Sequence, residues 1–119
     1  MDSEISFIPE ALKGRSNYME WKYRSEIYLG INGFMTYIDG TEAPPNKALY
    51  TNSKGEFLSR ELAITYNDNL SEYHRDERKA LGAVQSITSS DLVGRFMDKK
   101  TAKDLWDSIN KVYGESFTK

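Results

Sequence analysis

A long run of apolar residues at helical spacing constrains the fold more than any other feature of the chain. Its members follow one another in steps of three and four, with Glu77 the only polar residue in the register: Leu62, Tyr66, Leu70, Tyr73, Ala80, Val84 and Ile87. The run predicts either one long helix over residues 59–87 or two shorter helices that meet near residues 67–69, where Asn and Asp favour turns. No segment sustains the period-two alternation of a half-buried strand, so we expect an all-α fold.

A second amphipathic pattern predicts a helix near the C-terminal end. Thr101 is a favourable N-cap residue, and Asp104 stands three positions later, which gives a weaker form of the capping box. The apolar stripe that follows consists of Ala102, Leu105, Trp106, Ile109, Val112 and Tyr113. Gly114 is predicted to stop the helix, because glycine readily adopts the left-handed conformation of a C-terminal cap.

The first helix is expected to begin near Asn17. Asparagine is a good N-cap residue and Glu20 lies three positions later, so the two residues are expected to cap each other reciprocally. The expected apolar stripe consists of Tyr18, Trp21, Ser25, Tyr28 and Ile31, broadened by Ile27 and Leu29. Gly30 and Gly33 weaken the helix and mark its end.

Two shorter helices complete the expected set. One is predicted over residues 34–38, with Gly40 as its left-handed cap. The other follows the N-cap candidates at residues 88–91 and continues to Met97. About five helices are therefore expected.

Residues 39–56 are the only long loop. Pro44 and Pro45 hold part of it in an extended path, because proline fixes its own backbone angle and donates no backbone hydrogen bond. Tyr50 lies in this loop and Tyr23 lies off the stripe of the first helix. These two tyrosines are candidates for contacts with another molecule, whereas the other aromatic residues are better explained by core packing.

The chain of 119 residues is long enough for one domain. Residues 1–15 show no helical period, and we expect them to form an extended arm whose apolar residues lie across the core: Ile5, Phe7, Ile8 and Leu12. Residues 16–119 are expected to form a single compact bundle around an aromatic-rich core.

The composition excludes several kinds of chemistry. There is no cysteine, so a disulfide, a thiolate zinc site and a cysteine nucleophile are impossible. The chain has a single histidine, His74, in a charged helical stretch. A metal site with several histidine ligands is therefore excluded. No glycine-rich phosphate loop or nucleophile elbow occurs. We therefore expect no enzyme, no cofactor, no metal and no small-molecule substrate.

Charge and hydropathy limit the partners. The 16 basic and 18 acidic residues give a formal charge of −2, and neither half of the chain has a basic excess. Direct binding to a phosphate backbone is therefore not expected. The uncharged stretches are much shorter than the roughly 20 apolar residues of a membrane span. The N-terminus is acidic where a signal peptide is basic, so an intracellular, cytoplasmic protein is expected.

Two segments together resemble a known family. The first is Leu12-Lys-Gly14-Arg-Ser-Asn17-Tyr18-Met-Glu-Trp21, and the second is Thr101-Ala102-Lys-Asp-Leu-Trp106-Asp-Ser-Ile109 followed by Tyr113. In this order and separation they resemble the N-terminal part of Gag polyproteins from copia-type LTR retrotransposons. Ile109 stands where leucine is commoner in that family.

The resemblance implies a capsid-type helical domain that assembles into cytoplasmic virus-like particles around the RNA of the element. RNA would be held by a basic region or zinc knuckle elsewhere in Gag, and residue 119 would lie before a second capsid domain. The signature residues would be structural. Gly14 would let the arm turn, Asn17 would cap the first helix, and Trp21 would meet Trp106 in the core.

Assembly would use many weak contacts between copies of the chain. The candidates are the exposed residues of the arm and the loop, together with the outer faces of the helices: Ile5, Phe7, Ile8, Tyr23, Pro44, Pro45 and Tyr50. Two alternatives stay open at this point. One is a domesticated Gag relative that serves as a host factor, and the other is an unrelated helical protein–protein interaction module.

Overall fold

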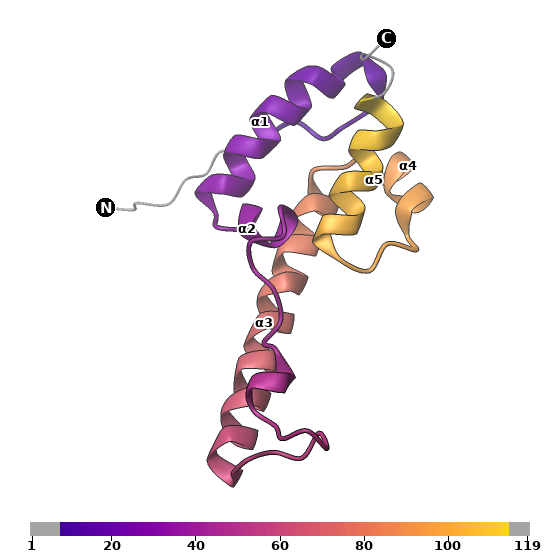
Figure 1. Cartoon of the computed structure of the whole chain (residues 1–119). Coiled ribbons are helices and arrows are strands. Elements are labelled where there is room, and N and C mark those ends of the chain that lie inside the picture. The colour runs from indigo at the N-terminus through magenta and orange to yellow at the C-terminus, as the bar shows by residue number, and fades with distance from the viewer. Residues whose placement is uncertain (1–7, 115–119) are drawn as a thin grey trace, which may run out of the picture.

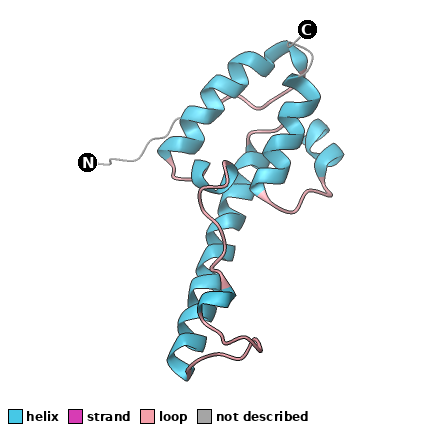
Figure 2. Ribbon diagram, in the orientation of Figure 1, coloured by secondary structure: helices cyan, strands magenta, loops and turns pink. Residues whose placement is uncertain are grey.

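The structure, a computed structural model, describes residues 8–114. In chain order the helices are η1 (Arg15–Asn17), α1 (Tyr18–Ile31), α2 (Met35–Ile38), η2 (Lys47–Leu49), α3 (Arg60–Ser86), α4 (Ser90–Val93), η3 (Gly94–Phe96) and α5 (Ala102–Gly114), where η marks a 3-10 helix. The described range contains no β-strand, only two isolated β-bridges. The expected all-α class is confirmed (Figures 1 and 2).

The helix α3 is a single helix of 27 residues. Ser59 caps it, with its hydroxyl oxygen accepting the Leu62 backbone N–H at 3.1 Å. The helix passes through residues 67–69 without a break, which decides between the two alternatives left by the sequence. These three residues are exposed, so their polar side chains can remain hydrated while the apolar residues on the other face hold the helix.

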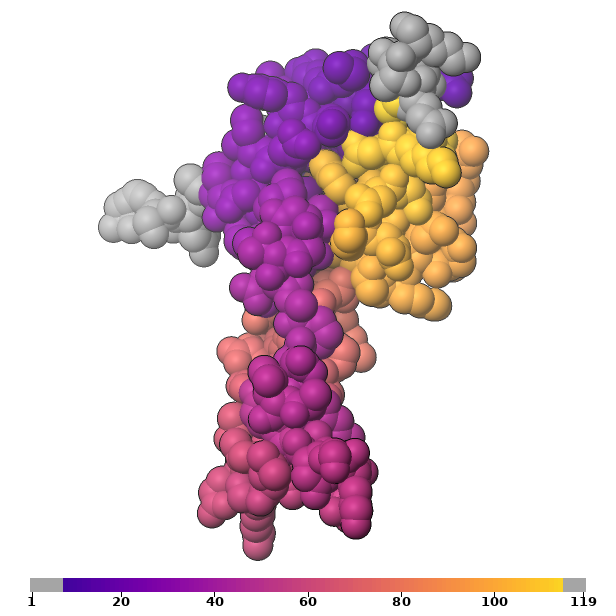
Figure 3. Space-filling view, viewed as in Figure 1, coloured from indigo at the N-terminus to yellow at the C-terminus, as the bar shows by residue number. Residues whose placement is uncertain are grey.

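The bundle and the N-terminal half of α3 form two regions (Figure 1). α1, α2, α4, α5 and the C-terminal half of α3 gather at one end, while the rest of α3 extends away from them. Residues 39–59 run along this extension and cover one side of it (Figure 3). The principal dimensions of 55 × 43 × 24 Å reflect this projection.

The extension of α3 has its own aromatic contacts. The ring centroid of Tyr66 lies 5.3 Å from that of Tyr50 and 5.7 Å from that of Phe57. The ammonium of Lys47 lies 5.3 Å from the ring centroid of Phe57. We call Tyr50, Phe57 and Tyr66 the distal cluster. Its aromatic contacts hold the long loop against α3, and the cation–π contact joins two parts of the loop itself.

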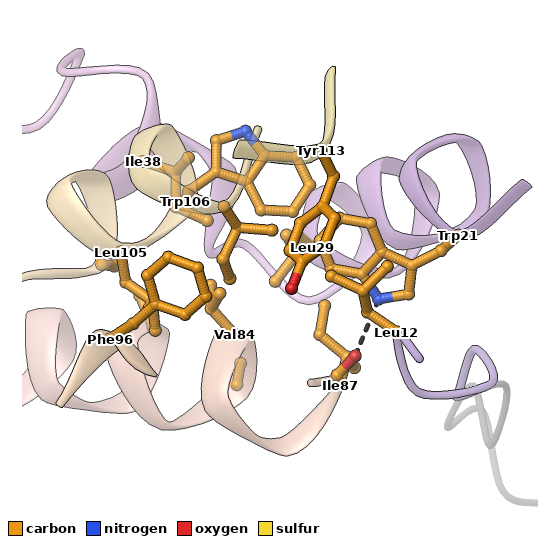
Figure 4. Close-up of a cluster of buried hydrophobic side chains, with 14 of the residues drawn as sticks. Leu12, Trp21, Leu29, Ile38, Val84, Ile87, Phe96, Leu105, Trp106 and Tyr113 are labelled. Atoms are coloured by element: carbon orange, nitrogen blue, oxygen red, sulfur yellow. Dashed lines mark hydrogen bonds between the residues drawn. The ribbon is translucent and has the colours of Figure 1, made fainter. Parts of the chain in front are cut away.

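The main core lies where α1, α3 and α5 meet (Figure 4). Its fully buried side chains include Leu12, Trp21, Leu29, Ile38, Val84, Ile87, Leu105 and Ile109. Burial of each large apolar side chain contributes about 1.5–3 kcal/mol. Most of the favourable free energy of folding therefore comes from this end of the molecule.

The described part of the arm crosses the bundle at Leu12 as expected, but Ile8, which was also expected to lie across the core, is 65% exposed. Leu12 is fully buried, its N–H donates to the Ile87 carbonyl at 2.9 Å, and its own carbonyl accepts the Ser89 N–H at 3.0 Å. Gly14 then turns the chain into η1 with a φ of 141°, in the region that favours glycine. The arm residues Ile5 and Phe7 lie outside the described residues.

The expected cap of the first helix was wrong. The carboxamide oxygen of Asn17 accepts the Lys13 N–H at 2.9 Å, and its amide group donates to the Ala11 carbonyl at 3.0 Å. Glu20 does not cap Asn17 but binds Arg24 at 2.9 Å. Asn17 is the last residue of the 3-10 helix η1, which leads directly into α1. Its side chain binds the arm instead of capping α1.

The predictions for two glycine caps and for the buried face of α1 had different outcomes. Gly40 has a φ of 87°, which confirms its left-handed conformation after α2. Gly114 was expected to adopt a cap, but it is helical and lies within α5. Ile31 was expected on the buried face of α1, yet it is 51% exposed while Leu29 is fully buried. Ile31 lies two residues after Leu29, and thus roughly 200° around the helix, because successive residues turn by about 100°.

Candidate functional site

The two signature segments meet at the contact between α1 and α5. The ring centroids of Trp21 and Trp106 lie 5.3 Å apart, which confirms that these indoles meet in the core. Tyr18 lies 6.0 Å from Trp21 and 6.4 Å from Tyr113, measured between ring centroids. We call these four residues the aromatic junction. The junction joins the two signature segments, which are far apart in the sequence. All four side chains are at least 93% buried, so they present no aromatic surface to a ligand.

Hydrogen bonds fix the rings of the junction. The Trp21 indole N–H donates to the Ile87 carbonyl at 2.7 Å, which links α1 to the end of α3 (Figure 4). The Tyr18 hydroxyl donates to the side-chain oxygen of Asn110, whose amide group donates to the Trp106 carbonyl at 2.7 Å. Burial, and then the negative charge of Glu26, raise the pKa of Tyr18 above its usual value. Tyr18 therefore remains a neutral hydrogen-bond donor.

The close contact between Tyr18 and α5 explains Gly114. A Cβ atom added at this position would lie 2.9 Å from the Tyr18 hydroxyl oxygen. Glycine is therefore required here by the approach of the tyrosine and not by a left-handed backbone. The sequence indicated that glycine matters at position 114, but it predicted a helix cap and not a close contact with Tyr18.

Two side chains satisfy the first backbone N–H groups of α5. The Thr101 hydroxyl oxygen accepts the Asp104 N–H at 3.1 Å, which confirms the predicted N-cap. A carboxylate oxygen of Glu77 accepts the Ala102 N–H at 2.5 Å. Glu77 is only 8% exposed, and its negative charge lies at the positive end of the α5 dipole. Sequence reasoning missed this role, although Glu77 stood out as the only polar residue in the α3 register.

The titratable residues are otherwise arranged as on a surface. The ion pairs of the described residues lie between partly or largely exposed side chains, for example Lys103 with Asp107 at 2.9 Å. His74 is exposed and contacts the ring of Tyr73. Within residues 8–114 no three His, Asp or Glu side chains form a group that could hold a metal ion. The arrangement supplies packing, capping and surface charge.

A shallow groove beside α3 brings three carboxylates together with two tyrosine rings. It is lined by the rings of Tyr37 and Tyr73 and by the carboxylates of Glu42, Glu72 and Asp76. The Tyr37 hydroxyl donates to Asp76 at 3.5 Å. Burial, followed by the neighbouring carboxylates, raises the pKa of both tyrosines.

The assembly candidates lie in separate regions. Ile8 and Tyr23 are 65% and 68% exposed on the bundle, whereas Pro44 is exposed and Pro45 half-buried in the loop beside α3. Tyr50 is half-buried in the distal cluster, where its hydroxyl oxygen lies 3.5 Å from the Asn69 amide nitrogen. Tyr50 therefore has partners within the chain, whereas most of the Tyr23 side chain is exposed to solvent.

Comparisons with protein-family models, curated proteins and solved structures return no significant match for this chain. Among the described residues no helix combines the length and the apolar character needed to cross a membrane. What the domain does must therefore be argued from its own residues.

Proposed function

We propose that this chain is a structural, self-associating helical domain of the capsid type, as in Gag proteins of copia-type retrotransposons. The observation that carries the proposal is the aromatic junction. The two segments that resemble the Gag family come from opposite ends of the chain, and their signature residues Tyr18, Trp21, Trp106 and Tyr113 pack into one contact. A shared structural task is the simplest reason for two distant motifs to occur together.

The proposal also agrees with the chemistry of the site. The signature side chains are occupied by internal contacts, so partners would meet the outer faces of the helices and the loop. Capsid lattices use weak contacts that become effective when many copies are tethered together. The near-balanced charge of −2 permits close approach of identical chains without strong repulsion.

RNA would be held by another part of the Gag protein in this proposal. Two lysines of the basic stretch before and at the start of α5 have carboxylate partners: Lys99 pairs with Asp98 at 3.4 Å, and Lys103 pairs with Asp107 at 2.9 Å. Arg95 donates to the Tyr113 hydroxyl at 3.3 Å. The two ion pairs reduce the uncompensated positive charge of this surface, on which phosphate binding depends. Cytoplasmic virus-like particles would be the functional state.

A nuclease-protection experiment tests the proposal. The complete open reading frame that contains this chain is expressed, the lysate is fractionated on a sucrose gradient, and each fraction is treated with nuclease. We expect fast-sedimenting fractions that contain the protein and protect its own transcript. A Trp106→Ala variant, whose core is broken, should lose both properties. Protein found only in slow-sedimenting fractions, with no protected transcript, would favour a host factor or an unrelated interaction module.

A further inference from the structure

The helix α1 has apolar side chains on two opposite faces. Its inner face buries Tyr18, Trp21, Ser25 and Leu29 against the bundle. The opposite face carries four exposed apolar residues, which we call the outer stripe: Met19, Tyr23, Ile27 and Ile31. Their exposed fractions are 58%, 68%, 41% and 51%. Packing in the core therefore explains the apolar residues of the inner face of this helix but not those of the outer stripe.

The outer stripe has the geometry of a packing ridge. Its members are four residues apart throughout, and rows with this spacing form the ridges that interdigitate in the commonest class of helix–helix packing. α1 lies along the outer edge of the bundle, with α2 and α5 on its inner side (Figures 1 and 3). Single exposed apolar residues are ordinary, but a continuous row on one helix indicates an interaction surface.

The charges beside the stripe complement a reversed copy of the same helix. One flank carries the pair Glu20 and Arg24, separated by 2.9 Å, with the acid first along the chain. The other flank carries Lys22 and Glu26, separated by 4.0 Å, with the base first. Each flank therefore holds one charge of each sign. In an antiparallel pair centred near the middle of the stripe, each flank meets its own reversed copy. Glu20 then lies near Arg24 of the other copy and Lys22 near its Glu26, while the bases of both copies lie nearest to the axis.

We propose that the outer stripe binds the outer stripe of a second copy of this chain, in an antiparallel pair with a two-fold axis close to Tyr23. Tyr23 then meets its own symmetry mate, and Met19 meets Ile27 of the other copy. Such an interface is self-complementary, as a two-fold contact must be. The inference deepens the proposed function, on which it rests, by naming the surface through which one pair of copies associates.

The small area of this contact predicts that two copies associate weakly. A helix of this length presents a strip about 21 Å long and roughly 10 Å wide, well below the ~800 Å² per partner that is typical of stable complexes. Association of the isolated chain is therefore expected only at high concentration. Tethering within a particle would raise the effective concentration and populate the pair.

Sedimentation velocity of the full chain, from micromolar to millimolar concentration, tests the pair. The informative variants are Tyr23→Glu and Tyr23→Lys, because each places two like charges near the two-fold axis. We expect the sedimentation coefficient of the unchanged chain to rise with concentration and each variant alone to associate more weakly. The loss should be at least about tenfold for Tyr23→Lys, which adds two positive charges beside Lys22 and Arg24 of both copies, and smaller for Tyr23→Glu. An equimolar mixture of the two variants should associate again, since opposite charges then face each other. Met97→Glu, at a 74% exposed residue that follows η3, is the matched control and should associate like the unchanged chain.

Three results would overturn the pair. The first is undiminished association of both Tyr23 variants, and the second is a mixture that associates no better than either variant alone. The third is a monomer at every concentration; if removal of residues 1–7 then creates association, the stripe belongs to the chain's own arm. Thermal unfolding of each variant verifies that folding is intact. The proposed function fails separately, because transcript protection by the complete protein does not depend on which helix forms the pair.

Discussion

The indole rings of Trp21 and Trp106 lie 5.3 Å apart between centroids, with their planes inclined by 33°. Trp21 also donates its indole N–H to the carbonyl of Ile87 at the end of α3. One tryptophan pair thus connects the first helix, the last helix and the end of the longest helix. This contact determines how the outer faces of these helices are presented to other molecules.

Replacement of Trp106 by alanine should destabilise the domain by about 3–5 kcal/mol, the usual range for truncating a buried large aromatic residue. The ring is 7% exposed and packs on Trp21, so its removal leaves a cavity between α1 and α5. Urea and thermal unfolding measure the change. Val112→Ala, on the same helix but 37% exposed, is the control and should cost much less. Equal unfolding midpoints for the two variants would contradict the role of the indole pair.

Replacement of Glu77 by alanine should cost about 1–3 kcal/mol, because the buried Ala102 N–H loses its acceptor. Glu77→Gln keeps an oxygen acceptor but removes the charge at the α5 N-terminus, so its cost should lie between alanine and the unchanged chain. Chemical denaturation of both variants tests this order. The exposed Glu72→Gln in the middle of the same helix, away from a helix N-terminus, is the control. If all three variants unfold together with the unchanged chain, Glu77 does not stabilise α5.

The raised pKa of Tyr18 predicts a loss of stability at alkaline pH. Burial disfavours the phenolate, so the folded chain retains this proton to higher pH than the unfolded chain does. The contribution is complete below the unfolded pKa of about 10 and decreases as the pH rises through the folded pKa. Unfolding free energies measured across this window should fall less steeply for Tyr18→Phe, which has no proton to lose. An identical slope for both chains would contradict the assignment.

The isolated chain should bind single-stranded RNA weakly or not at all at physiological salt. Its formal charge is −2, and the nearby carboxylates already compensate Lys99 and Lys103. Fluorescence anisotropy with a labelled oligonucleotide, repeated over a salt series, measures the affinity. Asp107→Asn is a useful comparison, since it removes one compensating charge and should increase binding. Micromolar affinity of the unchanged chain with a steep salt dependence would show an RNA-binding face instead.

The long elements could be predicted from the sequence because periodicity alone defines them. The α3 stripe from Leu62 to Ile87 is apolar apart from Glu77, and the α5 stripe begins at Ala102. Thr101 caps α5 as expected. The meeting of Trp21 and Trp106 could also be predicted, since large aromatic residues on two inner faces of a small bundle have few other places to lie.

The details that failed depend on tertiary contacts. The side chain of Asn17 could cap α1 or bind the arm. Because the arm lies beside it, it binds the backbone of Lys13 and Ala11 and does not cap the helix. In α1 both faces are apolar, so the stripe could be drawn through Ile31 although the bundle buries Leu29. Glu77 could be recognised as unusual within its register, but only the packing of α5 against α3 shows which N–H it accepts.

Electron microscopy of the complete open reading frame product tests the central proposal most directly, because the proposal is that this domain builds particles. Purified protein is imaged beside the Trp106→Ala variant, in which the contact between α1 and α5 is broken. We predict closed particles of regular appearance for the unchanged protein and none for the variant. Dispersed monomers or small oligomers in both samples, at concentrations where the unchanged protein is folded, would contradict a capsid-type function.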